Sequence, residues 1–115
     1  MVTVQLESNW YVSDRTGVAM YFVRVITMPF PPAPGSYIFF HDGMGFADPV
    51  EVVIWCHDCQ RYIVQEEVSV QSDELFRPGN DDPDICTRVE LHMRSLGFVP
   101  EDEVPDRCRL ACVCD

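Results

Sequence analysis

Residues 17–28, GVAMYFVRVITM, are a long stretch of apolar and β-branched residues in which Arg24 is the single charge. Apolar side chains fall on both alternating faces of this stretch, as is typical of a β-strand that is buried on both sides. It ends at residues 29–35, PFPPAPG, whose prolines cannot donate hydrogen bonds to a sheet ladder. We therefore predict a long buried strand followed by an extended, polyproline-like loop.

Several shorter segments around this strand also have the composition or the alternation of β-strands. The CHDC segment, residues 56–59, lies between the predicted strands 50–55 and 60–71 and is therefore predicted to form the tip of a hairpin. Near residue 115, cysteine or leucine occupies every second position, which predicts a short closing strand. The further predicted strands are residues 2–7 with an extension over 9–14, residues 36–40, 50–55 and 60–71, and the closing strand with Cys108, Leu110, Cys112 and Cys114 facing inward.

One α-helix is predicted over residues 83–96. Asp82 is suited to the N-cap and Pro83 to the first helical position. Gly97 fits the left-handed position after the helix, where Phe98 can complete a Schellman-type cap. Apolar residues recur at helical spacing along one stripe, which comprises Ile85, Val89, His92 or Met93, and Leu96.

Together these elements predict a single α+β domain over residues 1–115. The simplest arrangement is a small antiparallel meander or an SH3-like, partly open barrel of about five strands. The helix at about residues 83–96 would pack against this sheet, and the short C-terminal strand would close it.

The charge of the chain is strongly acidic and unevenly distributed. Nineteen acidic residues face eight basic ones, all of them arginine, for a net charge of −11. Residues 66–115 carry thirteen of the acids but only five of the arginines. Such a field repels phosphate backbones and anionic lipid, so direct binding to nucleic acid or to a membrane is disfavoured. A charged protein partner is expected to be basic.

The absence of lysine removes Schiff-base and P-loop chemistry, and the sequence contains none of the common catalytic motifs. The first hypothesis is therefore a small, acidic, non-enzymatic protein-interaction module that has no cofactor. Two aromatic residues are expected to be exposed because they lie in loops, and three acidic clusters include candidates for contact with a basic partner. The predicted partner-binding residues are Phe30, Phe46, Asp81, Asp82, Glu101, Asp102 and Glu103.

Two features of the sequence bear on where the protein resides. The N-terminal residues, MVTVQLESNWY, lack the basic region and the apolar core of a signal peptide. No apolar run approaches the ~20 residues of a membrane-spanning helix. We therefore expect a cytoplasmic protein with reduced thiols.

The cysteines support a second hypothesis, a zinc-stabilised domain. Cys56 and Cys59 are spaced so that both thiolates can reach one tetrahedral zinc ion from a tight turn, and Cys112 and Cys114 would complete the site. Cys108 with Cys112 is the alternative second pair. A catalytic dithiol is disfavoured because Cys56 and Cys59 do not begin a helix. In the remaining interpretation the thiols simply pack as small apolar groups.

Two His-Asp dipeptides, at residues 41–42 and 57–58, suggest a third hypothesis, a metal-dependent hydrolase. Such sites require further histidine ligands, and only His92 remains, on the apolar side of the predicted helix. Both dipeptides follow predicted strands, where Asp is a common turn residue. The sequence therefore favours a non-enzymatic protein.

Overall fold

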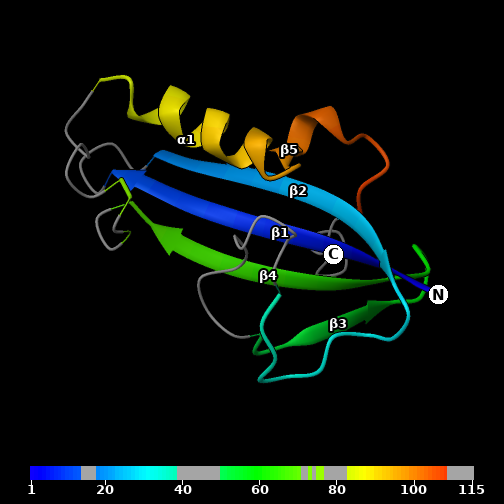
Figure 1. The fold of residues 1–115 in the computed structure, drawn as a ribbon. Coiled ribbons are helices and arrows are strands. Elements are labelled where there is room, and N and C mark those ends of the chain that lie inside the picture. The colour runs from blue at the N-terminus through cyan, green and yellow to red at the C-terminus, as the bar shows by residue number, and fades with distance from the viewer. Residues whose placement is uncertain (14–17, 39–49, 71–72, 74, 77–82, 109–115) are drawn as a thin grey trace.

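The computed structural model describes residues 1–13, 18–38, 50–70, 73, 75–76 and 83–108 of the chain. Within these residues the chain forms a five-stranded sheet, one α-helix and a short 3-10 helix (Figure 1). This arrangement confirms the α+β class that the sequence predicts. The elements in chain order are β1 (Val2–Ser13), β2 (Val18–Met28), β3 (Val53–Cys56), β4 (Arg61–Ser69), α1 (Ile85–Ser95), β5 (Val99–Pro100) and η2 (Glu101–Glu103).

β1 is the central strand of the sheet, whose order is β3-β4-β1-β2-β5. β2 pairs antiparallel with β1 along nearly its whole length, from Val2 opposite Met28 to Ser13 opposite Val18. On the other side of β1 lies β4, which runs parallel to it. β3 and β5 are short antiparallel strands that form the two edges of an open sheet.

The parallel pairing of β1 with β4 differs from a purely antiparallel meander. β2 occupies one side of β1, so the β3–β4 hairpin can add to the central strand only on the other side. β3 begins beside the middle of β4, with Val53 opposite Val64, and runs toward the end of the sheet where β1 begins, so the hairpin after Cys56 sends β4 in the direction of β1. Sequence periodicity indicates strands but not the side on which each one pairs, which is why this order was not predicted.

The main hydrophobic core lies between α1 and one face of the sheet, called here the helix face (Figure 1). Alternate residues of β1 point into it, and α1 contributes Ile85, Val89 and Met93. Complete burial of one such side chain contributes about 1.5–3 kcal/mol. The sheet residues of this core are Val4, Leu6, Trp10, Val12, Phe22, Val64 and Val68.

The C-terminal end of α1 is a Schellman motif, as the sequence predicts. Gly97 has a φ of +85° and donates its N–H to Arg94 O at 3.0 Å, while Phe98 donates to Met93 O at 3.0 Å. The Arg24 guanidinium of β2 donates to the carbonyl of Leu96 at 2.6 Å. The carbonyl groups of Met93, Arg94 and Leu96 are therefore satisfied, which fixes the direction in which β5 leaves.

The N-terminal end of α1 differs from the prediction. The helix begins at Ile85, two residues later than expected, and its N-cap is Asp84, whose side chain makes no capping hydrogen bond. Pro83 and Asp84 form a turn, and the predicted N-cap, Asp82, lies outside the described residues. No helix in the described part of the chain is long and apolar enough to cross a membrane.

Two predicted strands differ from the structure, and a third lies mostly outside the described residues. β3 begins at Val53 rather than at residue 50, and it includes Cys56. Residues 36–38 are not a strand, although Ser36 O accepts a hydrogen bond from Val50 N–H at 2.7 Å; residues 39–40 lie outside the described part. The predicted closing strand falls mostly on residues 109–114, which also lie outside it. The fifth strand is β5, whose two residues include a proline and therefore give no periodic signal.

Two glycines with positive φ provide a matched test of the helix end. A Cβ at Gly97 would lie 3.1 Å from the Arg24 guanidinium, whereas a Cβ at Gly35, where φ is +90°, would meet open space. We expect Gly97→Ala to lower the free energy of unfolding by about 2 kcal/mol and Gly35→Ala by about 1 kcal/mol, because both alanines are strained but only one displaces Arg24. Urea unfolding measures both values. Equal losses would show that Arg24 does not hold the helix end.

Candidate metal centre

The turn between β3 and β4 brings two cysteines together. Cys56 is the last residue of β3, residues 57–60 form the turn, and β4 begins opposite Cys56 at Arg61. Gln60 has a φ of +55°, which is unusual for a residue other than glycine, and its side-chain amide donates to His57 O at 2.5 Å. This conformation closes the turn tightly and lets Cys59 fold back beside Cys56.

A third cysteine, Cys108, reaches the same place from the other end of the sequence. The sulfur atoms of Cys56, Cys59 and Cys108 all lie within 4.8 Å of one another, and those of Cys56 and Cys108 are 2.9 Å apart. All three are free thiols. Sulfur atoms that share a tetrahedral zinc ion lie roughly 3.8 Å apart, as follows from a Zn–S distance of about 2.3 Å. Shifts of about an ångström would therefore place the three sulfurs at three corners of such a site.

The surroundings of the thiols act on their acidity in opposite directions. The pKa of Cys56 is lowered, first by the hydrogen bond from the Cys108 thiol and then by hydrogen bonds from the backbone N–H groups of Cys59 and Asp58. The pKa of Cys108 is raised, first by burial and then by its hydrogen bonds with the two other thiols. A bound cation would offset the cost of a buried Cys108 thiolate, so the group least able to ionise alone is the one that gains most from a metal.

The buried side chain of Gln5 holds Cys108 in place. Gln5 lies on β1 and points to the sheet face opposite the helix face. Its amide oxygen accepts the Cys108 N–H at 2.9 Å, and its amide nitrogen donates to the Cys108 carbonyl at 2.9 Å. Arg61 also donates to the Gln5 oxygen at 3.2 Å. One side chain thus pairs with the backbone of Cys108 much as a neighbouring strand would.

A buried carboxylate secures the residue before Cys108. Glu7, which is only 7% exposed, accepts hydrogen bonds from Gln5 at 2.9 Å and from Gln65 at 2.7 Å. The Arg107 guanidinium lies 3.7 Å from the same carboxylate and 2.8 Å from that of Glu101. A buried charge is costly without partners, so this network strongly favours one position of residues 107–108.

The structure brings only part of the predicted zinc set together. Cys56 and Cys59 are adjacent as expected, but their described neighbour is Cys108, which the sequence analysis placed in the alternative pair. Cys112 and Cys114 lie outside the described residues, so their roles remain predictions. Among the described residues, the three thiols are the one group of three or more potential metal ligands that meet within 4.8 Å. The polar residues at positions 5 and 7 of a predicted strand were the overlooked signal.

The predicted partner-binding residues lie in different environments from one another. Phe30 is 77% exposed, as expected for the proline-rich loop. Glu103 pairs with Arg94, and Glu101 pairs with Arg107, so these carboxylates are engaged within the chain, whereas Asp102 is exposed and has no ion pair among the described residues. Phe46, Asp81 and Asp82 lie outside the described residues.

The histidines that motivated the hydrolase hypothesis do not meet in the described structure. His57 is exposed in the β3–β4 turn. His92 lies on α1, where its ring packs against those of Trp10 and Phe76 at centroid distances of 6.5 and 5.4 Å. His41 lies outside the described residues.

Comparison of the chain with protein-family models, with curated proteins and with solved structures gave no match.

The pairing of Gln5 with Cys108 can be tested without metal. We expect Gln5→Met to lower the free energy of unfolding of the reduced, metal-free protein by about 2–3 kcal/mol, because the buried backbone groups of Cys108 would lose their partners. Gln65→Met is the control, since it removes a single hydrogen bond to Glu7 from an exposed side chain and should cost about 1 kcal/mol or less. Similar losses in the two variants would contradict the assigned role of Gln5.

Proposed function

We propose that this protein is a non-catalytic zinc-binding domain in which Cys56, Cys59 and Cys108 hold a structural ion. The observation that carries the proposal is the meeting of three free thiols, two from the β3–β4 turn and one from the segment after η2. In this role the ion fastens residues 107–108, called here the C-terminal segment, to the sheet. Gln5 and Glu7 already hold this segment in position.

The donor set favours zinc over the other common divalent ions. Thiolates are soft ligands that select zinc and similar metals, whereas calcium and magnesium require oxygen ligands. The tight turn around Cys56 and the fixed backbone of Cys108 suit a small, regular coordination shell. The filled d shell of zinc imposes no geometry of its own, so zinc accepts the tetrahedral arrangement that four thiolates provide.

The fourth ligand in this proposal is Cys112 or Cys114, both of which the sequence analysis placed in the zinc site. Three residues separate Cys108 from Cys112 and five separate it from Cys114. Each residue of extended chain spans up to about 3.3–3.6 Å, so either thiol has enough chain to return to the site. Four thiolates leave no position for water on the metal, which is the arrangement of structural zinc sites and not of catalytic ones.

The role of the stabilised domain in this proposal is to bind a basic protein. Support comes from the net charge of −11 and from the absence of lysine and of catalytic motifs. The leading and the second sequence hypotheses are thus combined, because a zinc ion stabilises the fold while an acidic surface makes the contact.

Metal analysis of single-cysteine variants tests the ligand set. Protein prepared under reducing conditions with zinc should contain one zinc ion per chain. Cys56→Ala, Cys59→Ala and Cys108→Ala should each lose the ion and melt at a lower temperature, because zinc binding contributes directly to folding free energy. Cys86→Ala is the control, since Cys86 lies on α1 and packs against the core, and it should keep its zinc.

The fourth ligand and the contrary outcomes are measured on the same preparations. Loss of zinc in Cys112→Ala or in Cys114→Ala identifies the fourth ligand, and the double variant covers exchange between them. Metal-free protein whose six thiols all react after unfolding would contradict the proposal. Two missing thiols, restored by a reductant, would instead identify a disulfide.

A further inference from the structure

The outer edge of β2 has a strand partner for only two of its residues. β5 pairs through Val99 with Val23 and through Pro100 with Phe22, and then the chain turns away into η2. Residues 18–21 of β2 continue beyond this point and have no strand on their outer side within the described part of the chain. The sheet therefore offers an unpaired edge of four residues in line with β5.

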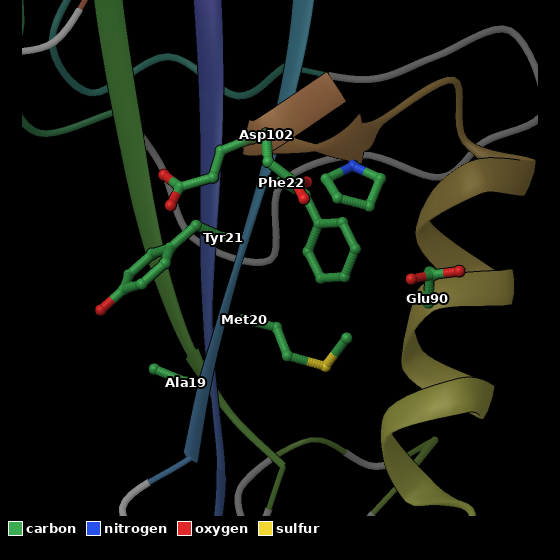
Figure 2. A pocket seen from close by; sticks show the side chains of 8 residues that line it. Ala19, Met20, Tyr21, Phe22, Glu90 and Asp102 are labelled. Carbon is green, nitrogen blue, oxygen red and sulfur yellow. The ribbon is translucent and has the colours of Figure 1, made fainter. Parts of the chain in front are cut away.

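A cavity of about 300 Å³ lies beside this unpaired edge. Its lining comes from residues 19–22 of β2, from Glu90 of α1 and from residues 100–102. Figure 2 shows that Met20 and Phe22 point toward α1, whereas Tyr21 points to the other side of β2. The cavity is thus lined on the β2 side by the apolar side chains of Met20 and Phe22 and elsewhere by the acidic residues Glu90 and Asp102, and β5 lies at one end of it.

The charge around the cavity is negative and only partly compensated. Asp102 is exposed and has no ion pair among the described residues. Arg94 is shared between Glu90 and Glu103, so one guanidinium serves two carboxylates. Arg107 is likewise shared between the carboxylates of Glu7 and Glu101. The lining itself contains no basic residue.

We propose that this edge, residues 18–21 of β2 together with Glu90 and Asp102, binds an extended, basic segment of a partner protein by β-strand addition, an inference that rests on the basic partner of the proposed function. The backbone of the segment would hydrogen-bond to β2 where β5 leaves it. Alternate side chains would face either Met20 and Phe22 or the opposite face of the sheet. Arginine or lysine side chains of the segment would pair with Asp102 and Glu90.

Charge complementarity decides the occupant. A second copy of this chain would bring a further net charge of −11 to an edge that is already acidic, and repulsion disfavours that pairing. A basic segment gains from the same field, both in its rate of encounter and in the pairing of its side chains. An extended conformation is required because the available partner is a strand edge and not a closed pocket.

The test uses a capped nine-residue peptide of alternating arginine and valine, added to ¹⁵N-labelled, zinc-loaded protein at low ionic strength. We expect amide shifts to concentrate at residues 18–21 of β2 and at Glu101 and Asp102. Two matched peptides separate backbone pairing from charge. A version N-methylated at every residue lacks strand donors on both of its edges and should bind at least about tenfold more weakly, and a version with glutamate in place of arginine should not bind.

Variants of the protein then locate the charges. Asp102→Asn and Glu90→Gln should each weaken binding about two- to fivefold, the range for exposed ion pairs, and added salt should reduce the difference. Glu51→Gln is the control, because Glu51 is exposed and lies outside the cavity lining, and it should leave binding unchanged. Shifts spread over other surfaces, equal binding of the N-methylated peptide, or no binding at millimolar peptide would overturn the proposal. Zinc content, measured on the same sample, is a separate result, because no cavity residue belongs to the thiol site.

Discussion

The structure depends on the need to cover β1 on both faces. As the central strand, β1 presents apolar residues to α1 on the helix face, and on the other face it carries Gln5 and Glu7, which are buried beneath the C-terminal segment. The first requirement is met by a helix with an apolar stripe. The second is met by hydrogen bonds, because a buried amide and a buried carboxylate each require partners. The position of Cys108, and with it the thiol site, follows from the second requirement.

The predictable part of the fold is the part that local chemistry determines. Residues 17–28 were recognised as a strand from their apolar and β-branched side chains, but the predicted burial on both faces was wrong, because Tyr21 and Val25 are exposed. The end of α1 was recognised because Gly97 adopts a conformation that favours glycine. The start of α1 was less predictable, since Asp82, Pro83 and Asp84 offer competing caps. The parallel pairing of β4 with β1 depends on which edge remains free after β2 has formed, and no local pattern contains that information.

The candidate site was likewise predictable only where the local sequence determines its geometry. Cys56 and Cys59 were recognisable because their spacing lets a single turn present both thiols. Cys108 was assigned to them only in the alternative pair, because the residue that holds it is Gln5, near the other end of the described chain, and that contact is recognition of a backbone by a side chain. A polar residue at a strand position that should be buried is a usable signal, since it must have a partner. It does not say which segment supplies the partner.

The contact between Gln5 and Cys108 also bears on the order of events during translation. The two residues are 103 positions apart, so β1 leaves the ribosome well before its polar face can be covered. The β1–β2 hairpin can form early from neighbouring residues, whereas β4 and the segment around Cys108 arrive later and close progressively longer loops. Until then Gln5 and Glu7 remain hydrated. Because these side chains are polar, the incompletely covered β1 exposes less apolar surface to other nascent chains. The buried polar residues that select the C-terminal segment in the finished protein would thus also protect the unfinished one from aggregation.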